Sequence, residues 1–167
     1  MIVNGGKYTA NGIGSPVIYS TADVTVNNAT LISTKSEGAV VEGKNLITLN
    51  NVNLTDNNTT LNGNSETYKN IFLYQSMSGD AASGTSQFTM NGGSLTSKNG
   101  HVFHVTNTNA VISLKDVTID NQDSENILLS VCADGWSGGS NIATLKASSQ
   151  TLTGAIKVGS DSSLTLE

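Results

Sequence analysis

One eight-residue segment occurs twice in this chain of 167 residues, and the two copies lie 23 residues apart. "VTVNNATL" spans residues 24–31 and "ITLNNVNL" spans residues 47–54. Each copy places two apolar residues around a Thr, followed by a pair of asparagines. A short unit that recurs at a fixed period is typical of solenoids, propellers and other arrays. The repeat therefore constrains the fold more than any other feature of the sequence.

The unit can be followed through the whole chain from the second apolar residue of each copy. This anchor recurs at intervals of 23, 23, 41, 24, 31 and 21 residues, at Val3, Val26, Leu49, Met90, Leu114, Leu145 and Leu166. The longer intervals become regular when insertions at about 56–85 and 132–141 are set aside. We therefore expect a single domain over residues 1–167 with a repeat of ~22 residues and about six copies.

Each copy contains three short segments that favour strands. Apolar and polar residues alternate over three to five positions, Val and Thr are frequent, and Gly, Asn and Ser separate the segments. No window has a helical period. Equivalent strands of successive copies would stack in parallel at a spacing of ~4.8 Å. The pattern predicts an all-β fold, a parallel β-helix.

A recurring asparagine favours this arrangement over the alternative, an antiparallel sandwich. The residue after the anchor is an asparagine in four copies, at Asn4, Asn27, Asn50 and Asn91. Asn tolerates the left-handed backbone of a tight corner, and stacked amides can form hydrogen bonds along the stacking direction. A sandwich gives no reason for one corner to recur at a fixed period.

The repeat from "VTVNNATL" to "GAVVEG" (38–43) resembles the right-handed parallel β-helices of the pectate-lyase-like superfamily, and it is most similar to the repetitive, adhesin-like surface proteins of bacteria in that group. The resemblance covers essentially the whole chain and implies a right-handed solenoid. It leaves the activity open, because this solenoid carries lyases, hydrolases, binding modules and stalks. Both ends cut through a repeat without a capping helix, which predicts either a fragment of a longer protein or a chain whose ends are covered by a partner. We expect a fragment of a surface protein, extracellular or on the cell surface, with its signal and anchor elsewhere.

Composition argues against several classes of partner and enzyme. The net charge is −5 and all eight basic residues are lysines, so we expect no nucleic-acid partner. No run of 18 apolar residues exists, so we expect no membrane insertion. The lyases of the superfamily use an arginine as base, and this chain has none. Hydrolases on this fold need clustered carboxylates, whereas Asp116, Asp120 and Asp123 are interpreted as corner residues. No catalytic residue is assigned.

We expect no cofactor. His101 and His104 are three apart in an expected strand, which would place them on opposite faces, where they could not share a metal. Ca²⁺ remains an alternative at the oxygen-rich segments 55–66 and 78–84, although neither matches an EF-hand loop or a calcium β-roll. No metal ligand is assigned.

Two features point to a ligand site. Alignment on the third segment places Tyr19, Glu42, Tyr74 and His104 at one position, where stacked strands would bring them within ~5 Å of one another. Aromatic faces beside hydrogen-bonding groups suit a sugar. Trp136, in the second insertion, is the other predicted ligand-binding residue. The two columns beside it are both apolar, one including Val40 and Phe72 and the other including Val41 and Leu73, so the predicted column could instead be packed inside. Trp136 could likewise pack on the neighbouring insertion.

The sequence therefore predicts a non-catalytic, adhesin-like module that binds polysaccharide or host glycoprotein. The alternatives are a structural stalk that associates with itself end to end, and a polysaccharide lyase or glycoside hydrolase. An exposed ridge of tyrosines or an exposed Trp136 would favour binding. Three or more carboxylates in one groove would favour an enzyme.

Overall fold

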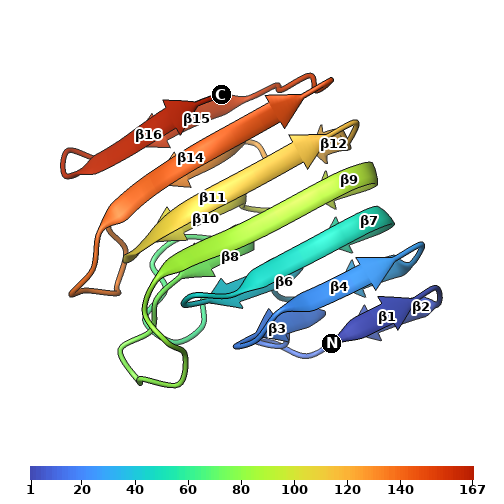
Figure 1. Cartoon of the computed structure of the whole chain (residues 1–167), viewed down its shortest axis with the longest axis horizontal. Coiled ribbons are helices and arrows are strands. Elements are labelled where there is room, and N and C mark those ends of the chain that lie inside the picture. The colour runs from blue at the N-terminus through green and yellow to red at the C-terminus, as the bar shows by residue number, and fades with distance from the viewer.

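The computed structural model describes residues 1–167 and contains strands and their connections only (Figure 1). The strands are β1 (Ile2–Asn4), β2 (Lys7–Ala10), β3 (Ile18–Ser20), β4 (Val24–Asn27), β5 (Thr30–Ser33), β6 (Ala39–Glu42), β7 (Leu46–Asp56), β8 (Lys69–Tyr74), β9 (Thr85–Ser97), β10 (His101–Thr106), β11 (Thr108–Lys115), β12 (Thr118–Asn121), β13 (Ile127–Val131), β14 (Asn141–Ser148), β15 (Ala155–Val158) and β16 (Ser162–Leu166). No helix is present that could cross a bilayer.

The strands form two sheets, and all their pairings are parallel. The ten-stranded sheet runs in the order β1-β4-β7-β9-β11-β14-β16, with β2, β5 and β12 beside this path. The six-stranded sheet runs in the order β3-β6-β8-β10-β13-β15. The chain alternates between the sheets as it advances, so both are ordered from the N-terminal to the C-terminal part of the chain (Figure 1). The predicted all-β class and the parallel stacking of repeats are confirmed.

The two sheets enclose one apolar core of 28 buried residues. The ten-stranded sheet contributes residues such as Leu49 and Phe88, and the six-stranded sheet contributes residues such as Leu73 and Phe103. The rings of Phe88 and Phe103 meet edge to face, with centroids 6.0 Å apart. Because side chains alternate across a strand, every second residue of most strands reaches this core.

The pairing register confirms the predicted alignment of the repeats as far as Leu114 and corrects the alignment at Leu145. Val3, Val26, Leu49, Met90 and Leu114 follow one another across five strands, as the anchor predicts. The next anchor is wrong, because Leu145 pairs with Ile112 and Leu114 pairs with Ala147. A shift of two residues keeps every side chain on its own face, so the apolar pattern cannot exclude it.

The predicted asparagine column is confirmed as a ladder of hydrogen bonds. Each side-chain amide donates from Nδ2 to Oδ1 of the asparagine one strand earlier, over 2.8, 2.8 and 2.9 Å. The members are Asn4, Asn27, Asn50 and Asn91. Asn28 and Asn51, the next residues in two of these copies, have left-handed backbones with φ of 54° and 51°. A neutral hydrogen bond of this kind contributes about 1 kcal/mol to stability.

One inward side chain is a carboxyl group. Asp56 ends β7, pairs with Ser97 and is fully buried, and neither of its carboxyl oxygens has a hydrogen-bond partner. It lies directly against Gly38, where a Cβ would be only 2.6 Å from Asp56 Oδ2. Burial, and to a lesser degree the negative charge of Glu37, raises the pKa of Asp56 well above its usual range. The site therefore favours the neutral acid.

Candidate functional site

The outer face of the six-stranded sheet carries a second apolar cluster. Val40, Phe72 and Tyr74 are buried there, with Trp136 packed against them. The connecting segments 57–68 and 132–140, which contain no strand, cover this face. A Cβ at Gly63 would lie 3.5 Å from the Trp136 ring, so the two segments meet at that point. Of the two neighbouring apolar columns, Val41 and Leu73 of one lie in the core, and Val40 and Phe72 of the other lie beneath these segments.

The strand register separates the predicted column into two. Glu42 pairs with Tyr74, as expected. Tyr19, however, pairs with Val40, and His104 pairs with Phe72, so each lies two residues from its predicted place. All four still share one face, because the displacement is an even number of residues.

Aromatic rings and one carboxylate form a continuous set on this face. Phe72 stacks on Tyr74 with ring centroids 4.3 Å apart, and Trp136 meets Tyr74 edge-on at 4.8 Å. The Tyr19 hydroxyl donates to Glu42 Oε2 and lies 2.9 Å from the Tyr74 hydroxyl. Burial and the hydrogen bond to Glu42 raise the pKa of Tyr19, and burial raises the pKa of Tyr74 to about 12 against the opposing effect of Tyr19. Both phenols therefore stay protonated at neutral pH.

A hollow of about 150 Å³ opens between Tyr19 and the covering segments, and we name it the aromatic hollow. Its walls are Tyr19, Phe72, Tyr74 and Trp136 with the polar side chains of Glu37, Asn62 and Ser65, and with Gly14, Pro16, Val40 and Gly63. Tyr19 is 51% exposed, whereas Tyr74 is almost fully buried. Trp136 is half-buried, so it both packs on the neighbouring insertion and remains accessible. Glu42 and His104 are buried beneath the hollow and are not among its wall residues.

Asp134 holds the two covering segments together. Its Oδ1 accepts backbone N–H bonds from Glu66, at 2.5 Å, and from Gly135, at 2.7 Å. Its Oδ2 lies 3.1 Å from His104 Nε2 and 3.9 Å from Lys69 Nζ. Burial alone would raise the pKa of Asp134, but the hydrogen bonds from His104, Gly135 and Glu66 lower it to about 2. No sequence motif singled out this residue.

The carboxylate fixes the direction of a buried chain of hydrogen bonds. Burial lowers the pKa of His104, which is therefore a neutral imidazole. Asp134 can only accept, so His104 Nε2 donates to it and His104 Nδ1 accepts from Ser130 Oγ at 2.6 Å. His101 Nδ1 must then donate to the same hydroxyl at 2.7 Å. Ser130 is fully buried, so this arrangement offers no hydroxyl that a substrate could reach.

The two histidines correct one prediction from the sequence. They were expected on opposite faces, yet both contact Ser130 on the outer face. The residues between them, Val102 and Phe103, both belong to the inner core. Two consecutive inward residues interrupt the alternation of β10, and residues three apart then share a face.

A further hollow of about 240 Å³ lies beside His101, and we name it the acid-lined hollow. Glu66, Asp123 and Glu125 line it together with His101 and Lys157. Asp123 serves the local backbone, because its two oxygens accept from Gly100 N at 2.8 Å and from Glu125 N at 2.9 Å. The remaining carboxylates belong to different segments of the chain, which sequence spacing could not bring together.

No group of three or more His, Cys, Asp or Glu side chains is arranged so that it could hold a metal ion. Comparisons of the chain with protein-family models, with curated proteins and with solved structures find no match.

Proposed function

We propose that the chain is a right-handed parallel β-helix that binds glycans, without catalysis, at the aromatic hollow. The observation that carries the proposal is the half-exposed Tyr19 ring beside Trp136, in a hollow that also contains a carboxylate and an amide. A pyranose has an apolar face that packs on an aromatic ring and a rim of hydroxyls that needs hydrogen-bond partners.

The register supports the solenoid part of the proposal. Residues 24–27 pair in parallel with residues 47–50, one 23-residue repeat later, and the chain passes through the six-stranded sheet in between. A parallel pair requires a crossover connection, and crossovers between parallel strands of a sheet are right-handed in almost all proteins.

The dimensions and chemistry of the hollow favour a sugar unit over a larger apolar ligand. At about 150 Å³ it is smaller than the ~300 Å³ at which sites for drug-sized molecules begin. Glu37 offers acceptors for sugar hydroxyls, and Asn62 offers both donors and acceptors. A polysaccharide or a host glycoprotein presents such units outside the cell, where a module of this kind would lie.

Binding to immobilised polysaccharides and mucin tests the proposal. Tyr19→Ala and Trp136→Ala should each weaken glycan binding at least tenfold, because central aromatic anchors contribute about 2 kcal/mol or more. Tyr8→Ala is the matched control, since Tyr8 is similarly exposed, at 44%, and is not part of the hollow. If the wild type binds no glycan, or if all three variants bind like the wild type, the proposal is wrong.

The acid-lined hollow supports a second candidate, a glycoside hydrolase. Glycosidases need two carboxyl groups on either side of the scissile bond, and Glu66 and Glu125 reach this hollow from different segments. Reducing-sugar release should be measured in the same samples. If reducing sugar is released by the wild type and not by Glu125→Gln, the glycoside hydrolase is favoured. If glycan is bound without release of reducing sugar, the non-catalytic binding module is favoured.

A further inference from the structure

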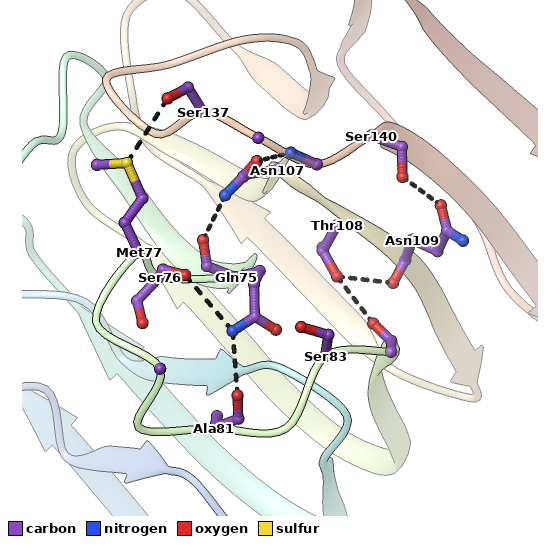
Figure 2. Close-up of a pocket in the computed structure, with 14 residues that line it drawn as sticks. Gln75, Ser76, Met77, Ala81, Ser83, Asn107, Thr108, Asn109, Ser137 and Ser140 are labelled. Carbon is purple, nitrogen blue, oxygen red and sulfur yellow. Dashed lines mark hydrogen bonds between the residues drawn. The ribbon is translucent and has the colours of Figure 1, made fainter.

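A third hollow, of about 540 Å³, is lined in part by residues of segment 132–140 and is larger than the aromatic and acid-lined hollows (Figure 2). Three stretches of chain surround it, residues 75–84, 107–109 and 137–140. Trp136 lines the aromatic hollow and Ser137, the next residue, lines this one, so the two hollows are neighbours. We name it the amide-lined hollow.

The wall of the amide-lined hollow contains no charged and no aromatic side chain. Its side chains are amides, hydroxyls and glycines, with Met77 and Ala81 as the apolar exceptions. The chain has 21 charged residues, eight basic and 13 acidic, and none of them lines the hollow. A charged ligand would lose hydration here without gaining a counter-charge, and an apolar ligand would find little surface to pack on.

One side chain joins the three walls. Asn107 donates from Nδ2 to the Gln75 carbonyl at 2.7 Å and accepts at Oδ1 from Gly139 N at 2.5 Å. Gln75 Nε2 in turn donates to the Ala81 carbonyl at 3.2 Å, across its own loop. Figure 2 shows these bonds around the rim. The walls are therefore held in place before a ligand arrives, which reduces the ordering cost of binding.

Other polar groups of the wall remain free. Asn109 uses Oδ1 to accept from Ser140 Oγ, but its Nδ2 donates to no group of the chain. Ser83 is exposed and its hydroxyl has no partner in the chain. A ligand that both donates and accepts at closely spaced positions would satisfy these groups, and hydroxyls do both. The paired strands of β8 and β10 offer no free edge here for an extended peptide.

We propose that the amide-lined hollow is a second subsite for the glycan held at the aromatic hollow and that it takes an uncharged sugar unit. The proposal rests on the proposed function. A single sugar unit fills the aromatic hollow alone, and a longer neutral chain passes over segment 132–140 and gains the second set of contacts.

Calorimetry with neutral oligosaccharides of increasing length tests this proposal, using the cello, manno and N-acetylglucosamine series beside oligogalacturonate. Wild-type affinity for the neutral chain that binds should rise with length and then level off. Ser83→Trp, which fills the hollow, should lower the affinity for the longest chain at least tenfold. Its affinity for the shortest sugar that binds should stay within twofold of the wild-type value. Asn109→Ala should lower the affinity for the longest chain about fivefold, because one hydrogen bond to the sugar is lost.

Matched variants separate the possible outcomes. Ala82→Trp places the same bulk on an exposed neighbour outside the wall and should change neither affinity. Tyr19→Ala should weaken binding of chains of every length. If Ser83→Trp and Asn109→Ala bind long chains like the wild type, the second subsite is wrong and the proposed function stands. If oligogalacturonate gains as much from length as neutral chains do, the preference for uncharged sugars is wrong. If the wild type binds none of these sugars, both proposals fail.

Discussion

Replacing the buried Asp56 by asparagine should make the protein more stable at neutral pH and leave it unchanged in acid. The Asp56 carboxyl has no hydrogen-bond partner and its pKa is raised by burial and by Glu37. In the unfolded chain the same group titrates at about 3.9. The folded state therefore holds a proton that the unfolded state has released, and stability falls as pH rises between the two pKa values, by about 1.4 kcal/mol per pH unit. The loss accumulates until the pH passes the pKa of the folded state, above which the carboxyl ionises in both states and stability no longer changes with pH.

Urea unfolding at pH values from 3 to 8 measures this effect, because the midpoint reports the free energy of unfolding when the slope is constant. Asp56→Asn cannot ionise, so its stability relative to the wild type should rise with pH above about 4, by about 1.4 kcal/mol per pH unit. Asp80→Asn makes the same substitution at an exposed loop residue and is the matched control, for which we expect a flat difference. A flat difference for Asp56→Asn as well would refute the reasoning, since the carboxyl would then ionise in the folded state as it does in the unfolded one.

Two further predictions concern the segments that cover the outer face and the packing of neighbouring strands. Asp134→Asn removes the charge that pairs the covering segments, so hydrogen exchange should accelerate in 57–68 and 132–140 and not in the strands. In the wild type the same protection should be lost as pH falls from about 4 towards 2, because the pKa of Asp134 is depressed to about 2. Gly93→Ala should lower stability by about 3 kcal/mol or more in urea unfolding, because a Cβ there would lie 2.1 Å from the Val52 carbonyl oxygen. Gly92→Ala meets nothing within 4 Å and should cost about 1 kcal/mol, from its left-handed backbone alone.

The sequence was sufficient to predict the sheets because the same contacts recur in each copy. The spacing of Val26 and Leu49 recurs in the structure as a strand pair, and the asparagines form the expected ladder. What it could not predict was the register at Leu145 and at His104, each displaced by two residues. Alternation has a period of two, so apolar patterning is equally satisfied by registers that differ by two. Turn lengths and side-chain contacts decide between them.

Sequence reasoning named three of the residues that line the aromatic hollow, but it did not give their arrangement or the other walls. Tyr19, Tyr74 and Trp136 were identified because aromatic residues stood at outward or inserted positions, and they do line one hollow. Glu42 and His104 lie beneath it as buried hydrogen-bonding partners. The role of Asp134 depends on a loop conformation and on a contact with Glu66 that lies 68 residues away, which no local pattern encodes.

The separation of these partners has a consequence for the order of folding. Neighbouring strands of the ten-stranded sheet join residues 21 to 41 apart, from the pair Asn141 and Ser162 to the pair Leu49 and Met90. The contacts around the aromatic hollow instead join Tyr19 to Tyr74 across 55 residues and Glu66 to Asp134 across 68. Contacts between distant segments form only after the intervening chain has been ordered, because loop closure opposes them until then. The aromatic hollow would therefore be completed late in folding, and a nascent chain that ended before Asp134 would have most of its strands stacked while the hollow still lacked Trp136.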